Sequence, residues 1–143
     1  MAIAIASDHA GFALKEELEA ALVARSVAVD DLGTHDTSST DYPDYAHRLA
    51  DGVATGKWER GILVCGTGVG MAISANRHKG VRAVVCSEPY SARLSREHND
   101  SNVLCIGARV VGVGMALEIL DAWLGASFEG GRHASRVAKI ERG

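Results

Sequence analysis

The stretch CGTGVG, residues 65–70, combines one cysteine with three glycines at alternate positions. It lies between an apolar run, residues 61–66, and an amphipathic segment, residues 69–78, so we expect a loop that joins a strand to a helix. Glycines in such a loop let main-chain N–H groups converge on an anion. The helix dipole would favour the thiolate of Cys65, which could then act as a nucleophile or a general base. The alternative is a buried thiol beside a tightly packed turn.

Three known motifs do not fit this loop. The third glycine comes one residue too early for the dinucleotide fingerprint, and no acidic residue ends the next strand. A Walker loop would need a Lys-Ser or Lys-Thr pair, which is missing. A cysteine phosphatase of the Cys-x5-Arg type would have an arginine where this chain has Met71.

Polar residues also accompany two other apolar runs. Asp8 and His9 directly follow the run 2–7, where Asp8 would either face a ligand or cap the next helix. His98 and Asn99 precede another run, so they are expected at the opposite, amino edge of a sheet. They are then surface residues, unless a second subunit brings them to the site.

Three arginines offer a phosphate site. Arg132 and Arg136 are four residues apart, which puts them on one face of a short helix. Together with Arg109 they would hold a phosphate dianion through charge-assisted hydrogen bonds. A solvated basic tail is the alternative.

The elements that must position these residues alternate as apolar strands and amphipathic helices. Apolar strands separated by helices predict a parallel sheet covered on both faces, and right-handed crossovers then give a doubly wound, Rossmann-like α/β/α sandwich with five strands in one domain, residues 1–143. Ligands of such sheets bind beyond the carboxyl ends of the strands, where Cys65 and Asp8 are expected. Strands are expected at residues 2–7, 27–33, 61–66, 81–87 and 102–108, and helices at 12–25, 41–56, 69–78, 89–98, 113–126 and within 132–142.

Composition narrows the class of protein. A net charge of −3 over 143 residues argues against nucleic acid as a partner. No apolar run approaches the length of a membrane span, and the N-terminus lacks the pattern of a secretory signal, so we expect a cytoplasmic protein. The spacing of the three cysteines matches no zinc motif, and we expect Cys86 and Cys105 to be small buried hydrophobes.

Motifs along nearly the whole chain resemble type B ribose-5-phosphate isomerase, a family that also includes galactose-6-phosphate and allose-6-phosphate isomerases. The resemblance implies aldose–ketose isomerisation of a sugar phosphate, without metal or organic cofactor, in a homodimer whose two chains share each site; pairing of two dimers into a tetramer stays open. The motifs are SDHAGF (7–12), TDYPDYA (40–46), CGTGVGMAISANR (65–77), GVRAVVCSEPYSARLSREHNDSNVLCIGARVVG (80–112) and DAWLGASFEGGRH (121–133).

The same resemblance assigns roles to residues. Cys65 would move a proton between C2 and C1, while Thr67 and the loop N–H groups hold the enediolate oxygens. His98 would open the furanose ring, helped by Asp8 or Thr67. Some relatives replace the cysteine with a glutamate further along, but GMAISANR contains no acid. The substrate-binding residues implied are Asp8, His9, Tyr42, Gly66, Gly68, Val69, Gly70, Asn99, Arg109, Arg132 and Arg136.

Two rival functions stay open on the sequence. A hexose 6-phosphate or a four-carbon sugar phosphate would need only a pocket of different length. A phosphosugar- or nucleotide-binding module without catalysis would use the same fold, although binding alone needs no thiol.

Overall fold

The computed structural model describes residues 1–142, and it alternates strands and helices in the predicted order. Within these residues, no helix is both long and apolar enough to cross a membrane. The elements are β1 (Ile3–Ser7), α1 (Phe12–Ala24), β2 (Val29–Asp31), α2 (Tyr42–Ala54), β3 (Arg60–Cys65), α3 (Val69–Ala75), β4 (Ala83–Val85), α4 (Pro89–Glu97), β5 (Val103–Gly107), α5 (Val113–Gly125) and α6 (Arg132–Ile140).

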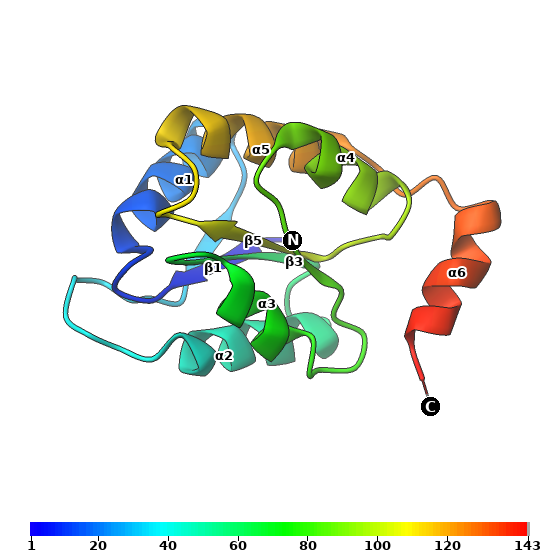
Figure 1. Cartoon of the computed structure of the whole chain (residues 1–143), viewed down its shortest axis with the longest axis horizontal. Coiled ribbons are helices and arrows are strands. Elements are labelled where there is room, and N and C mark those ends of the chain that lie inside the picture. The colour runs from blue at the N-terminus through cyan, green and yellow to red at the C-terminus, as the bar shows by residue number, and fades with distance from the viewer. Residues whose placement is uncertain (143) are drawn as a thin grey trace.

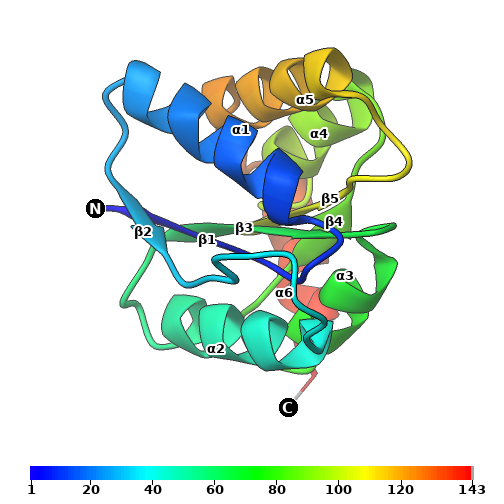
Figure 2. The ribbon, with the colours of Figure 1, turned by 90° about the vertical axis from the view of Figure 1, so that its left-hand side faces the viewer.

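All strand pairs are parallel, and the sheet order is β2-β1-β3-β5-β4. The chain moves outward from β1 to β2, returns to β3, skips one place to β4 and comes back to β5. Right-handed crossovers then require α1 and α4 on one face and α2 and α3 on the other. Figure 2 shows this arrangement, with α5 on the same face of the sheet as α1 and α4. The predicted three-layer α/β/α fold is confirmed.

Each face of the sheet has its own apolar core. Leu14, Leu18 and Leu22, spaced by four on α1, are buried against one face together with Trp123 of α5. On the other face, Leu49 of α2 belongs to a separate buried group. The central strands β1, β3 and β5 are buried almost throughout because helices cover both sides.

The two edge strands are shorter than predicted. β2 covers residues 29–31 of the expected 27–33, and β4 covers 83–85 of the expected 81–87. Each edge strand pairs on one side only and is partly exposed, so fewer residues continue the ladder.

α6 stands away from the two helix layers, beyond the amino ends of the central strands (Figure 1). Its end is tied to the body by Glu141, which accepts the Gly80 N–H at 3.3 Å and lies 3.6 Å from Arg82. The helix therefore projects from the domain instead of covering the sheet.

Candidate active site

A pocket of about 440 Å³ opens at the carboxyl edge of the sheet. It lies beside the neighbouring strands β1 and β3, from which the chain continues in opposite directions across the sheet: β1 leads to β2 on one side, and β3 leads toward β4 on the other. Ligands of doubly wound sheets bind at such a switch point. Because β5 lies next to β3, the loop after β5 joins the same pocket. The lining residues are Asp8, Tyr42, Cys65, Gly66, Thr67, Val69, Gly70, Ile73 and Arg109, and all except Ile73 were predicted from the sequence.

Cys65 ends β3 and lines the pocket, although only 5% of the residue is exposed. Its Sγ accepts the backbone N–H of Gly68 at 3.1 Å. Gly68 has a φ of 81°, in the left-handed region that favours glycine, and a Cβ there would come within 3.1 Å of the Ile106 backbone. A glycine is therefore needed to turn this N–H toward the sulfur.

The loop after β5 is fastened to the glycine loop by backbone hydrogen bonds. Arg109 donates its N–H to the Gly66 carbonyl at 3.0 Å, and Ala108 donates to the Cys65 carbonyl at 2.9 Å. The Arg109 guanidinium passes over Gly66, since a Cβ on that glycine would lie 3.4 Å from Nη1. A Cβ on Gly107 would lie 2.7 Å from the Thr67 backbone. The Arg109 side chain therefore places a positive charge over the loop that holds the thiol.

Asp8 lies between the start of α1 and the pocket. Its carboxylate is buried and accepts the N–H of Gly11, the residue that precedes α1, at 3.0 Å. The same residue lines the pocket. His9 accepts the Thr40 N–H at 3.2 Å through Nδ1, and thereby holds the loop that leads to α2. Tyr42, the first residue of α2, reaches the pocket from that side.

A second group of predicted residues lies at the opposite edge of the sheet. His98 and Asn99 directly follow α4, and Arg132 and Arg136 are on α6. Cys65 and His98 of one chain therefore lie at opposite edges of the sheet, as the sequence predicted. The His98 ring stacks on a neighbouring histidine, His133, with ring centroids 4.2 Å apart.

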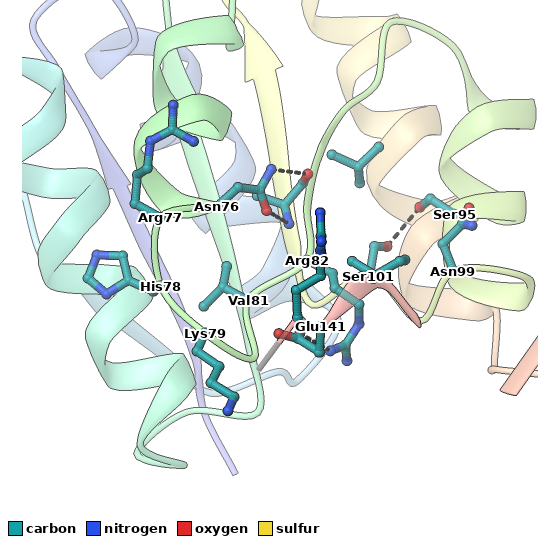
Figure 3. A pocket seen from close by; sticks show the side chains of 14 residues that line it. Asn76, Arg77, His78, Lys79, Val81, Arg82, Ser95, Asn99, Ser101 and Glu141 are labelled. Carbon is teal, nitrogen blue, oxygen red and sulfur yellow. Dashed lines mark hydrogen bonds and ion pairs between the residues drawn. The ribbon is translucent and has the colours of Figure 1, made fainter. Parts of the chain in front are cut away.

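A larger hollow of about 640 Å³ lies between the end of α3, the edge strand β4 and the last turn of α6 (Figure 3). Asn99 is among its lining residues. Its polar groups are largely occupied: Arg82 pairs with Asp100 and Glu141, and the Asn76 amide exchanges two hydrogen bonds with the Ala83 backbone. The smaller pocket, which holds the thiol, is the better candidate for chemistry.

The other two cysteines are buried, as predicted. Burial raises the pKa of Cys86 to about 11, with a smaller contribution from Glu88. Burial also raises the pKa of Cys105 well above its ordinary value. Both stay protonated near neutral pH and have no access to the pocket chemistry.

Three residues near the predicted groups were missed. Ile73 lines the pocket from α3, and its spacing of four from Val69 on an exposed helix face was the available signal. Glu129 and His133 lie beside His98. Their spacing of four residues, which brings side chains together on a helix or helical turn, was the available signal.

The chain matches the ribose/galactose isomerase family over residues 3–140. Ribose-5-phosphate isomerase B of Escherichia coli is 59% identical over 138 residues, which cover 96% of this chain and 93% of the relative. The D-erythrulose-4-phosphate isomerase of Pectobacterium atrosepticum is 44% identical over 98% of this chain and 93% of its own.

A solved structure gives the same result. Ribose-5-phosphate isomerase B of Clostridium thermocellum superposes with a TM-score of 0.96 at 53% identity, covering 98% of this chain and 95% of that one. The chain therefore belongs to the ribose/galactose isomerase family, among the type B ribose-5-phosphate isomerases, and is a sugar phosphate isomerase.

Proposed function

We propose that this enzyme interconverts ribose 5-phosphate and ribulose 5-phosphate, with Cys65 as the base. The observation that carries the proposal is the Cys65 sulfur, which lines an open pocket and accepts the Gly68 N–H at 3.1 Å. A hydrogen bond from an amide stabilises a thiolate, the form that removes a proton. The names of the E. coli and C. thermocellum relatives support ribose 5-phosphate as the substrate.

The chemistry needs one base and a set of amide donors. The Cys65 thiolate takes the proton from C2, and the resulting thiol returns it to C1, while a proton passes from O2 to O1. The negative charge that develops on these oxygens is stabilised by Thr67 and by N–H groups of residues 66–70. Loss of one such donor typically costs about 2.7–4 kcal/mol in the transition state.

His98, the ring-opening group in this proposal, comes from a second copy of the chain. In one chain it lies at the amino edge of the sheet, together with Asn99, Arg132 and Arg136. A two-fold symmetric dimer would bring this group to the partner's thiol pocket and the partner's group to this pocket. The apolar residues Val69 and Ile73, half exposed at the pocket rim, support a covered surface here.

The first experiment measures ribulose 5-phosphate formed from ribose 5-phosphate in the presence of EDTA. Cys65→Ala should lose at least about a thousandfold in kcat and still bind substrate, because only the base is removed. Normal turnover by this variant would end the case for a thiolate base.

The second experiment tests the shared site by mixing inactive subunits. After exchange of Cys65→Ala with His98→Ala chains, about half of the dimers are hybrids, and each hybrid holds one intact site and one doubly defective site. About a quarter of the wild-type activity should return. Arg109→Met is the matched control, because Arg109 lines the same pocket as Cys65 in one chain. At substrate well below KM, its mixture with Cys65→Ala should show no more activity than the average of the two unmixed variants.

A second candidate substrate is a four-carbon sugar phosphate. The Pectobacterium relative, named D-erythrulose-4-phosphate isomerase, supports it. Comparison of kcat/KM on ribose 5-phosphate, erythrulose 4-phosphate, allose 6-phosphate and galactose 6-phosphate decides between them. A preference for ribose 5-phosphate of less than about tenfold, or for another sugar, would overturn the first choice.

The cytoplasmic location expected from the sequence stays a prediction.

A further inference from the structure

Three side chains with metal-binding atoms gather at the amino edge of the sheet. His98 directly follows α4, Glu129 lies in the segment between α5 and α6, and His133 is in the first turn of α6. Glu129 Oε1 lies 3.6 Å from Nε2 of His98 and 3.6 Å from Nε2 of His133. One potential ligand atom from each of the three residues lies within 4.8 Å of the other two. The Glu129 N–H donates to the Glu97 carbonyl at 3.0 Å, which holds this segment beside the end of α4.

These distances are close to those of a zinc site. Zinc takes histidine nitrogen and carboxylate oxygen at about 2.0–2.2 Å in tetrahedral geometry, which separates neighbouring ligand atoms by roughly 3.3–3.5 Å. Two histidines and one glutamate with an open fourth position are an ordinary zinc set. Glu129 Oε1 already lies close to this distance from Nε2 of both histidines.

One adjustment is needed before an ion can bind. The His98 and His133 rings are stacked with only 12° between their planes, so at least one ring must turn before both nitrogens can direct a lone pair at the same ion. The His98 side chain is 34% exposed and that of Glu129 is 54% exposed, which leaves both room to rotate. His133, at 10%, would provide the fixed ligand.

Charges beside the cluster act in opposite directions on a cation. Glu129 supplies the negative charge of the cluster. Arg132 and Arg136, which lie on the same helix as His133, would repel a cation, so we expect weaker affinity than in structural zinc sites.

We propose that His98, Glu129 and His133 form an inhibitory site for a divalent transition metal of the Zn²⁺ type. A metal bound at His98 Nε2 occupies the lone pair that would otherwise accept a proton. The inhibition rests on the proposed function, in which His98 opens the sugar ring, whereas the binding does not.

Besides the carboxylates of Glu16, Glu19 and Asp31, which surround the Lys15 ammonium, two other places among the described residues compete for the same ions. Cys65 offers a thiol in the open pocket. His47 and His78 form an exposed pair, with Nδ1 of the first 2.8 Å from Nε2 of the second. The test therefore includes variants of both.

The binding experiment titrates EDTA-stripped, full-length protein with Co²⁺ and follows its visible absorption. Wild type should bind one Co²⁺ per chain at the cluster, and Glu129→Gln and His133→Asn should each weaken binding at least about tenfold. Cys65→Ser and His78→Asn are the controls and should keep it. Circular dichroism checks that each variant is folded, and Glu129→Gln, at a half-exposed position, is the variant expected to fold normally. Absence of binding at submillimolar Co²⁺, or binding that survives both Glu129→Gln and His133→Asn, overturns the site.

The activity experiment adds Zn²⁺ to the isomerase assay and then EDTA. Zn²⁺ should inhibit wild type reversibly, and Glu129→Gln should need at least about ten times more Zn²⁺ for the same inhibition. Full activity with the cluster loaded overturns the inhibitory role. If wild type isomerises no sugar phosphate at all, the proposed function fails, and the Co²⁺ titration still decides whether the site exists.

Discussion

The Tyr42 ring lies so close to Gly70 that a Cβ on this glycine would overlap the ring. Tyr42 begins α2 and Gly70 is in the first turn of α3, so the contact joins the two helices at the pocket wall. The glycine is needed here for the space it leaves to a neighbour rather than for its backbone angle.

Gly70→Ala should therefore displace the Tyr42 ring into the pocket. We expect kcat/KM to fall by about 10–100-fold, since small misplacements near a substrate have costs of this size. The melting temperature should change little, because Tyr42 is 39% exposed and its ring can move.

Gly114→Ala is the matched control for this change. It adds the same methyl group within α5, where the nearest 4 Å are empty. Activity should be unchanged, with stability the same or up to about 1 kcal/mol higher. Full activity of Gly70→Ala in the isomerase assay would show that Tyr42 does not shape the pocket.

Alkylation should distinguish the three thiols. Native protein treated with iodoacetamide near pH 8 should gain one adduct per chain, at Cys65, because Cys65 lines the open pocket while the raised pKa values of Cys86 and Cys105 keep them unreactive. Intact mass spectrometry measures this. Cys65→Ser should gain none, and unfolded wild type should gain three. An adduct on Cys105 in the native state would contradict the burial described here.

Arg109 should anchor the phosphate from the same chain as Cys65. Arg109→Met should raise KM by about 10–100-fold, which corresponds to one charge-assisted hydrogen bond of roughly 1.5–3 kcal/mol. Arg93→Met is the control, because Arg93 forms an exposed pair with Glu97 on α4. A smaller effect for Arg109→Met than for Arg93→Met would remove Arg109 from the phosphate site.

Glu19 should make stability depend on pH. Burial, with the neighbouring Asp31, raises the pKa of Glu19 to about 7 from an ordinary 4.5, so the fold favours its protonated form. That contribution is complete below pH 4.5 and is lost as pH rises through about 7. Gln cannot ionise, so Glu19→Gln should melt about 1–3 °C higher than wild type at pH 8 and no higher at pH 4.5.

The exposed Glu17 on the same helix provides the comparison for this pH effect. Glu17→Gln should shift the melting temperature equally at both pH values. A Glu19→Gln difference that does not grow with pH would show that the Glu19 carboxylate is not held in its protonated form.

Much of the molecule could be read from local pattern. The leucines of α1, spaced by four, and the apolar central strands are dictated by burial, which repeats with the period of each element. The link between Cys65 and the glycine loop was also readable, since both lie within six residues of sequence. The lengths of β2 and β4 were not, because each edge strand stops pairing two residues before its partner strand ends, and no local pattern marks that point.

The sequence by itself determined the element types, the three-layer class, the family and the separation of Cys65 from His98 within one chain. Only the tertiary structure decided that β5 lies between β3 and β4, which brings Arg109 beside the loop that follows Cys65. It alone also decided that Glu129 and His133 meet His98. The reason is physical: periodicity records which face of an element is buried, whereas the neighbours of a strand or helix depend on packing between segments far apart in the chain.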